Sequence, residues 1–143
     1  MGTLRTAAIT TVSTEHAPRP AGHYVQATIC GDLVCASGQL PIRPDGSHHP
    51  GASFEDQARQ ALANLFAVVE AAGSSRDRIV KVTAYIVGVE HWPSFNTVYA
   101  AVFGEARPAR TVVPVPELHH GYLVEVDAIA VVLTRRPDEG GRA

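Results

Sequence analysis

Residues 53–73 read SFEDQARQALANLFAVVEAAG and form the most strongly patterned segment of this chain. Ser53 stands three residues before Asp56, which is the spacing of a capping box with aspartate in place of the usual glutamate. Gly73 is a natural stop signal. Between these signals, apolar side chains recur at helical spacing and predict an amphipathic helix. The predicted apolar face consists of Phe54, Ala58, Ala61, Leu62, Leu65, Val68, Val69 and Ala72.

The segments on either side of this helix predict the strands of one sheet. A hairpin is expected where two apolar segments flank the turn Cys30-Gly31-Asp32, and a run of β-branched residues follows the helix. A second helix begins near Pro93, a residue that suits a first turn, and Gly104 ends it. The order β-β-α-β-α-β-β favours an α+β fold, with one mixed sheet and both helices packed on one face. The predicted strands are residues 24–29, 33–39, 79–87, 110–115 and 123–133, and the second helix is residues 93–103.

This arrangement leaves the other face of the sheet without helices. Such a face would carry apolar side chains that a second subunit buries, so the architecture predicts an oligomer. Cys30 and Cys35 are the only cysteines. We interpret them as small buried hydrophobic residues rather than as a disulfide or a redox pair.

The bulk composition fits one modest domain of 143 residues and 15.2 kDa. We expect a single domain over residues 1–143, with a core at about 9–134 and flexible ends at 1–8 and 135–143. A hydrophobic content of 45% argues against a disordered chain, and a net charge of −2 argues against a nucleic-acid partner. The sequence has no apolar run of about 20 residues and no secretory h-region. We therefore expect a cytoplasmic protein that does not contact a membrane.

Two charged residues stand where the predicted strands should disfavour them. Arg110 lies at the entrance of one strand, and Glu125 interrupts the apolar run of the next. Both are costly there unless a partner compensates the charge. A guanidinium matches a small carboxylate, so one interpretation is a pocket for a small organic acid. The alternative is a structural ion pair of Arg110 with Glu125 or with Asp127, which shares a strand face with Glu125.

Metal and nucleotide sites are not expected. His48-His49 and His119-His120 are adjacent pairs in loops, and neither has the helical spacing of a zinc site. The glycines lack the spacing of a phosphate-binding loop. Ser37 has no nucleophile-elbow motif, which argues against a serine hydrolase.

Several ordered motifs, spread over about residues 13–132, together resemble the Rid family of imine and enamine deaminases, also known as the YjgF family. Each motif is weak alone, and their order and spacing carry the resemblance. They are residues 13–18 (STEHAP), 22–26 (GHYVQ), 36–41 (ASGQLP), 57–65 (QARQALANL), 80–83 (VKVT), 95–96 (FN), 108–110 (PAR) and 124–130 (VEVDAIA).

The resemblance implies a chorismate-mutase-like α+β fold and a homotrimer with a ligand site at each subunit interface. It implies no metal and no organic cofactor. The implied activity is the hydrolysis of reactive 2-imino or 2-enamino acids to 2-keto acids and ammonia. The partners it implies are therefore small carboxylated imines, enamines or keto acids.

The family's functional residues match positions of this chain one by one. Arg110 matches the arginine that binds the substrate carboxylate, and Glu125 matches the carboxylate that positions or activates the attacking water. Tyr24 and Ser37 match the tyrosine and serine of the pocket, and Asn96 matches an asparagine near it. Each also has a simpler interpretation. Tyr24 could be an interface aromatic, Ser37 could bond only backbone groups, and Asn96 could cap a helix.

The chain also departs from well-known members of the family. Val112 stands where many carry cysteine, His23 where proline is common, and Pro114 where an acid is common. The loop at residues 116–121 differs too, and His120 is a candidate substrate contact. These changes leave three alternatives beside the deaminase. They are a pathway-specific enzyme for another imine or keto acid, an endoribonuclease, and a non-enzymatic ligand-binding trimer.

Overall fold

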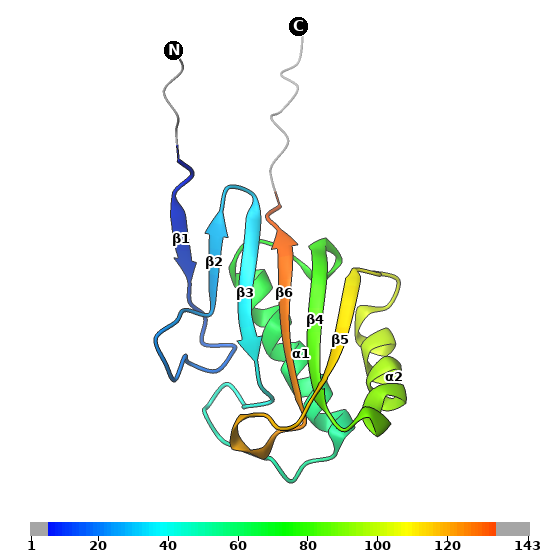
Figure 1. The fold of residues 1–143 in the computed structure, drawn as a ribbon. Coiled ribbons are helices and arrows are strands. Elements are labelled where there is room, and N and C mark those ends of the chain that lie inside the picture. Colours follow the sequence, from blue (N-terminus) through cyan, green and yellow to red (C-terminus); the bar gives the residue numbers. More distant parts are fainter. Residues whose placement is uncertain (1–5, 134–143) are drawn as a thin grey trace, which may run out of the picture.

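The computed structural model describes residues 6–133, which form one six-stranded mixed sheet with the strand order β1-β2-β3-β6-β4-β5 (Figure 1). β4 and β5 run parallel to each other, and every other neighbouring pair is antiparallel. The elements are β1 (Ile9–Val12), β2 (Ala27–Cys30), β3 (Leu33–Gln39), α1 (Phe54–Ala71), β4 (Ile79–Val87), α2 (Trp92–Phe103), β5 (Ala109–Val115) and β6 (Val124–Val131), with 3₁₀ turns at Arg76–Arg78, Val89–His91 and His119–Gly121.

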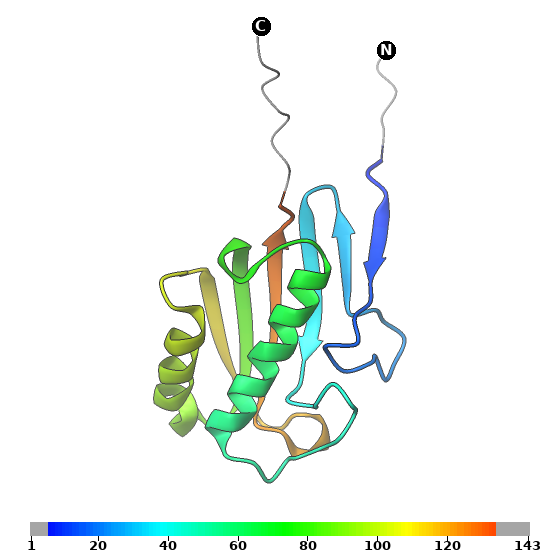
Figure 2. The ribbon, with the colours of Figure 1, turned by 180° about the vertical axis from the view of Figure 1, so that it is seen from behind.

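Both helices lie on the same face of the sheet, as the sequence predicts (Figure 2). The predicted cap of α1 is confirmed, because Ser53 Oγ accepts a hydrogen bond of 3.1 Å from the Asp56 N–H. Gly73 follows the helix with φ 83°, a conformation that glycine adopts without a steric penalty. The core forms where the apolar side of α1 packs on β3, β6 and α2. Its fully buried members include Leu62, Leu65, Val68, Val69, Val82, Ile86, Val124 and Val126.

The first strand, β1, was not predicted. It is four residues long, it pairs only with β2, and three of its residues are exposed, so its sequence carries no alternation of apolar and polar side chains. The predicted start of the next strand at Tyr24 is also wrong, because the chain bends through residues 21–26 and β2 begins at Ala27. Residues 1–5 and 134–143 lie outside the described residues. They include most of the segment 1–8 and all of the segment 135–143, the two ends predicted to be flexible.

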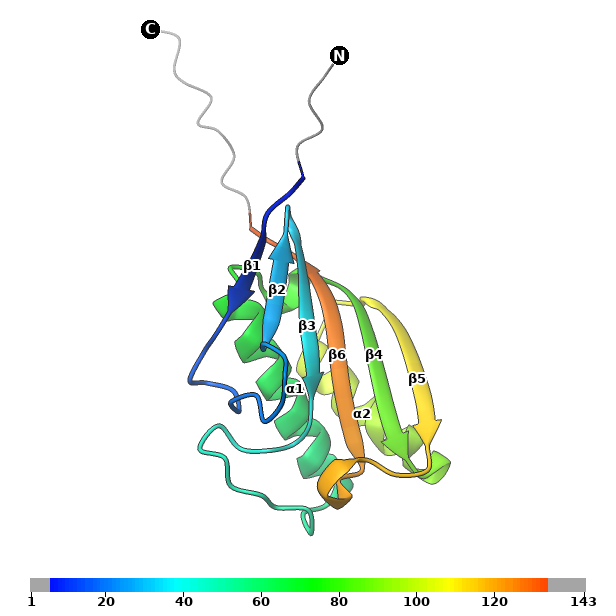
Figure 3. The same cartoon turned by 60° about the vertical axis from the view of Figure 1, so that its left-hand side comes forward.

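The face of the sheet opposite the helices is uncovered in the single chain (Figure 3). Leu33 is 48% exposed there and Ile129 is 39% exposed. Cys30 and Cys35 also point to this side, as neighbours of Leu33 and Ile129 in the strand register. The prediction that the cysteines are buried is therefore wrong for the single chain, where both are exposed and free. Within residues 6–133 no helix is long and apolar enough to cross a membrane.

A β-bulge lies in β3 next to β6. Ala36 pairs with Ala128 and Gln39 pairs with Val126, so two residues, Ser37 and Gly38, oppose one residue of β6. A bulge of this kind bends the strand and redirects its side chains. It opens the sheet surface above Glu125, and the candidate site begins there.

Candidate functional site

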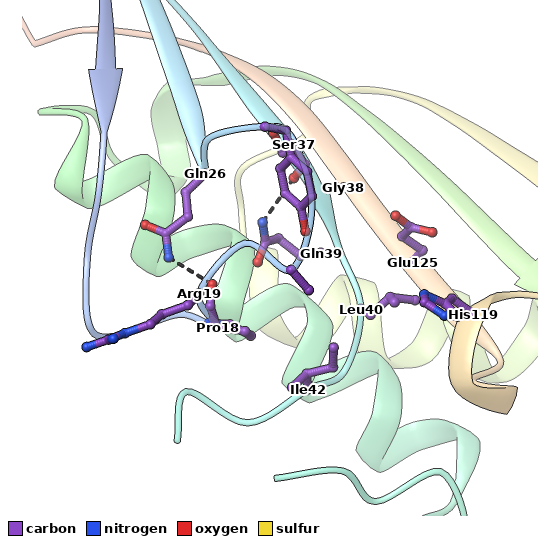
Figure 4. Close-up of a pocket in the computed structure, with 12 residues that line it drawn as sticks. Pro18, Arg19, Gln26, Ser37, Gly38, Gln39, Leu40, Ile42, His119 and Glu125 are labelled. Atoms are coloured by element: carbon purple, nitrogen blue, oxygen red, sulfur yellow. Dashed lines mark hydrogen bonds between the residues drawn. The ribbon is translucent and has the colours of Figure 1, made fainter. Parts of the chain in front are cut away.

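A cavity of about 400 Å³, here called cavity A, lies against the bulge of β3 (Figure 4). Its walls include Tyr24, Ser37, Gly38, His119 and Glu125. These residues come from the loop before β2, from β3, from the turn before β6 and from β6 itself. Three residues that the family resemblance selects, Tyr24, Ser37 and Glu125, are therefore brought together by the fold.

Gly38 makes room for the Glu125 carboxylate. A Cβ atom added at Gly38 would lie 2.2 Å from Glu125 Oε1 and 3.2 Å from its carboxyl carbon. No side chain fits there unless the carboxylate moves, so glycine at the bulge sets where Glu125 stands. Gly38 belongs to a motif of the sequence, but its role was missed because it depends on a partner strand 87 residues away.

The environment of Glu125 favours its protonated form. Partial burial raises the pKa of the Glu125 carboxyl, and the neighbouring Asp127 carboxylate raises it further, whereas His119 acts in the opposite direction. Burial likewise raises the pKa of Asp127, partly offset by the Tyr85 hydroxyl, which donates a hydrogen bond of 3.4 Å to the carboxylate. A carboxyl group with a raised pKa beside a cavity is a candidate for proton transfer.

Ser37 and Tyr24 differ in how they are held. The Ser37 hydroxyl donates a hydrogen bond of 2.6 Å to the Val25 carbonyl, so its proton is engaged by the backbone, as the simpler interpretation of Ser37 expects. Its oxygen keeps a lone pair for a ligand. Tyr24 is 52% exposed, and its ring packs against Gly22, where an added Cβ would lie 3.3 Å from the ring.

Buried amide side chains fix the loops around cavity A. Gln26 is 3% exposed, and its Nε2 donates to the carbonyls of Thr14, Ala17 and Pro18 at 3.0, 3.3 and 2.9 Å. Asn64 of α1 donates to the carbonyls of Leu40 and Ile42 at 3.0 and 2.7 Å. The cavity walls are therefore pinned to the core, which is the preorganisation that a binding site requires.

Arg110 occupies a second location, at the start of the edge strand β5. Its Nη2 donates a hydrogen bond of 2.8 Å to Asn96 Oδ1, and its guanidinium carbon lies 4.8 Å from the centre of the Tyr99 ring and 5.7 Å from that of Phe95. Asn96 lies in the second turn of α2, so it orients Arg110 and does not cap the helix. Burial raises the pKa of Tyr99 to about 12, although Arg110 opposes that shift. Arg110 itself is exposed, so its guanidinium group is accessible to a ligand.

Arg110 and Glu125 lie on opposite faces of the sheet. Arg110 pairs in parallel register with the buried Val82 and so shares the helix side. Glu125 pairs with Tyr85 on the uncovered side, and β4 separates the two strands. The structural ion pair considered for Arg110 is therefore wrong within one chain. Among residues 6–133 the salt bridge that forms is the exposed pair Arg59–Asp56 at 2.9 Å.

The candidate residues Val112 and His120 lie outside cavity A. Val112 is half-buried beside the core, on the same side of β5 as Arg110. His119 lines cavity A, and the candidate His120 faces a neighbouring cavity. In the described part of the chain no three His, Cys, Asp or Glu side chains are placed to hold a metal ion. The fold and cavity A define an α+β protein whose candidate small-molecule site lies at a bulge in a mixed sheet.

Comparison with known proteins identifies the family. The sequence model of the family described as Endoribonuclease L-PSP matches residues 14–132. A RutC family protein of Pyrococcus horikoshii is 41% identical over 119 residues, which are 83% of this chain and 94% of that protein. The 2-iminobutanoate/2-iminopropanoate deaminase of Escherichia coli is 40% identical over 124 residues, covering 85% of this chain and 96% of that protein. The crystal structure of Escherichia coli TdcF with bound serine has a TM-score of 0.81 and 37% identity, covering 85% of this chain and 98% of that chain.

The match to the family model spans strands β2 to β6, both helices and the residues that line cavity A. The chain belongs to the Rid (YjgF) family, and the resemblance found in its motifs is confirmed.

Proposed function

We propose that the protein hydrolyses reactive 2-imino and 2-enamino acids to 2-keto acids and ammonia. The observation that carries the proposal is the half-buried Glu125 carboxyl beside cavity A, whose pKa burial raises, with Tyr24 and Ser37 in the same walls. The deaminase named for the Escherichia coli relative and the serine bound to TdcF support a small amino-acid-derived ligand.

The proposed reaction needs one residue that binds the substrate carboxylate and one residue that transfers protons. Arg110 binds the substrate carboxylate, which places C2 of the imine beside a water molecule. Glu125 accepts a proton from that water while the new C–O bond forms. The same carboxyl passes that proton to the imine nitrogen, which gives a carbinolamine. It then carries the proton of the carbinolamine hydroxyl to the same nitrogen as the C–N bond breaks and the C=O bond forms, so one water is consumed and one ammonia leaves for each keto acid. Tyr24 and the free lone pair of Ser37 orient the water or the imine nitrogen.

The proposed active site is shared between copies of the chain. Within one chain Arg110 and Glu125 lie on opposite faces of the sheet, so one substrate cannot contact both. An exposed Arg110 on the edge strand β5 and an uncovered sheet face with Leu33 and Ile129 both favour assembly. We infer a homotrimer in which Arg110 of one copy completes cavity A of its neighbour. No cofactor or metal is needed for this chemistry.

Subunit complementation tests this site directly. Arg110→Ala and Glu125→Gln are each expected to be inactive as pure proteins. In trimers reassembled from an equal mixture, an interface works when one copy keeps Arg110 and its neighbour keeps Glu125. Random assembly gives that combination at about a quarter of the interfaces (one half times one half). Imine hydrolysis is followed by trapping the imine with semicarbazide, and recovery near that fraction supports the shared site.

Two other outcomes carry different meanings. Recovery of no activity, with mixed trimers demonstrated by mass spectrometry, would show that Arg110 and Glu125 do not act at one interface. Wild-type protein that hydrolyses no imine in a panel of side chains would reject the deaminase proposal itself.

A further inference from the structure

A second cavity, here called cavity B, adjoins cavity A. The two share walls at Pro18, Arg19, Ala21 and Ile42. Cavity B has a volume of about 530 Å³, and its remaining walls include His48, His120 and Asp45. A ligand held at Glu125 therefore has a neighbouring space beyond Pro18 and Ile42, and that space is lined by nitrogen donors.

Three imidazoles form one cluster along the boundary of the two cavities, in which His119 stacks on His120 and His48 packs against His120 at an angle of 54°. The ring centres of His119 and His120 are 3.7 Å apart with an interplanar angle of 19°, and those of His120 and His48 are 4.5 Å apart. His119 faces cavity A, whereas His48 and His120 face cavity B. His120 has φ 61° and is the non-glycine residue with positive φ among residues 6–133. Such a backbone conformation persists only where the surroundings hold it.

The buried Tyr122 orients His48, which lies at one end of the histidine cluster. Its hydroxyl lies 3.1 Å from His48 Nδ1 and accepts a hydrogen bond of 3.1 Å from the His49 N–H. With its lone pair used by His49, the hydroxyl proton is available to Nδ1, which favours the His48 tautomer that carries its proton on Nε2. His48 therefore offers an N–H donor on its unbonded side.

The hydrogen-bond donors around cavity B favour an anion. Arg19 is a permanent cation on the shared wall, and Figure 4 shows its side chain reaching away from Glu125. Asp45 also lines cavity B and keeps its negative charge, because hydrogen bonds from Ser47 lower its pKa, but its Oδ1 is occupied by these bonds of 2.8 and 2.6 Å from Ser47 N and Oγ. The donors that remain for a ligand come from Arg19, His48 and His120.

We propose that cavity B binds a distal carboxylate of the substrate, so that the enzyme prefers imines of dicarboxylic amino acids over imines with neutral side chains. This proposal rests on the proposed function, since the substrate's own imine is placed at Glu125 in cavity A. The distal carboxylate accepts hydrogen bonds from Arg19 and His48, and His120 adds a positive charge when it is protonated.

The preference should depend on pH. Burial lowers the pKa of His120, and the nearby His119 and His48 lower it further. His120 is therefore largely neutral at neutral pH and gains its proton as the pH falls, so affinity for a second carboxylate should rise with acidity. The charged or titratable groups around it are Arg19, Asp45, His48, Glu117, His119 and Tyr122.

The test compares two six-carbon ligands that differ in the distal group. Calorimetric titration measures 2-oxoadipate against 2-oxohexanoate, which are the products expected from 2-aminoadipate and norleucine imines. The same pair of imines, made by an amino-acid oxidase, is compared by semicarbazide trapping. We expect roughly tenfold tighter binding and faster hydrolysis for the diacid. The binding preference should grow as the pH falls below about 6.5, the ordinary value for histidine, because the pKa of His120 is lowered.

Two variants and one control separate cavity B from general electrostatics. Arg19→Gln removes the permanent cation, and His48→Phe removes the N–H donor but keeps a ring against His120. Both should reduce the diacid preference by roughly tenfold or abolish it. Arg43→Gln is the matched control, because Arg43 lies on the loop that carries His48 but outside both cavities, and it should leave the preference unchanged.

The outcomes also distinguish this proposal from the deaminase proposal. Equal binding of the diacid and the monoacid, or a preference that Arg19→Gln and His48→Phe do not change, would overturn the role of cavity B. Hydrolysis of the norleucine imine in that case would leave the deaminase intact. A diacid preference in binding that falls in both variants supports cavity B even in a protein that hydrolyses neither imine.

Discussion

Replacing Gly38 with alanine should displace Glu125 without unfolding the protein. The new Cβ would lie 2.2 Å from Glu125 Oε1, whereas ordinary contact begins at 3.4 Å, so the carboxylate must retreat by roughly 1 Å. The backbone at Gly38 does not require positive φ, so alanine fits it. Since a displacement of about 1 Å in a catalytic group can cost roughly 100-fold in rate, Gly38→Ala should lower kcat by about that factor.

The stability of this variant should change little. Bending the Glu125 side chain away from its preferred rotamer costs about 0.5–1.5 kcal/mol. Removing a glycine from the unfolded chain offsets this by about 0.4–1 kcal/mol. We therefore expect Tm to move by less than about 4 °C. Imine trapping gives kcat, and differential scanning calorimetry gives Tm.

Two comparisons make the Gly38 prediction sharp. Gly51→Ala is the matched control, because a Cβ at Gly51 would meet no atom within 4 Å; it should leave kcat unchanged and raise Tm slightly, through the same gain of about 0.4–1 kcal/mol from the unfolded chain. In a Glu125→Ala background the space beside Gly38 is empty, so Gly38→Ala should cause no further loss. A full rate for Gly38→Ala, or a further large loss in the Glu125→Ala background, would refute the view that Gly38 acts through Glu125.

Further substitutions test the other parts of the site. Arg110→Ala should lower kcat/KM by a factor equivalent to about 2–5 kcal/mol while the oligomer persists in light scattering, and Asn96→Ala should cause a smaller loss, because it only frees Arg110. Asp127→Asn should lower the pKa of Glu125, which that carboxylate raises, and so move the acidic limb of the rate profile to lower pH; an unmoved limb would count against Glu125 as the base. Because the pKa of Glu125 is raised in the folded protein, the free energy of unfolding falls as the pH rises from the ordinary carboxyl pKa through the pKa of the folded state. Glu125→Gln should therefore raise Tm at pH 7 and have little effect near about pH 4, and scanning calorimetry measures both. Ile129→Asp should give a folded monomer without activity in gel filtration, and an active monomer would reject the shared site.

The elements that the sequence predicts well are those with local signals. The cap at Ser53, the stop at Gly73 and the apolar face between them together define α1, and the bounds of β4 match the predicted residues 79–87. These features depend on neighbours within a few turns or on a run of β-branched residues. The family motifs likewise select Tyr24, Ser37 and Glu125, which the fold brings to one cavity.

The features that were missed depend on pairing between distant segments. The bulge at Ser37 and Gly38 exists only because β3 pairs with β6, about 90 residues later. The face of Arg110 could not be assigned either, because Val112 and Val113 are both apolar and β5 shows no alternation. Only the register of β5 on β4 places Arg110 on the helix side. His119 was passed over for the same reason, since a loop sequence does not say which of two adjacent histidines turns inward.

The division of the site across the sheet links the proposed activity to assembly. Within residues 6–133 Arg110 forms no ion pair, and it contacts Asn96 and the aromatic rings of α2, so its charge remains available to a ligand. Glu125 is held in a setting that disfavours its charge, at a cost to the stability of its own chain. A substrate carboxylate gives Arg110 its partner, and an attacking water gives Glu125 its proton. In the proposed trimer both interactions form only where two copies meet, so an isolated chain carries both unfavourably placed charges without catalysing the reaction.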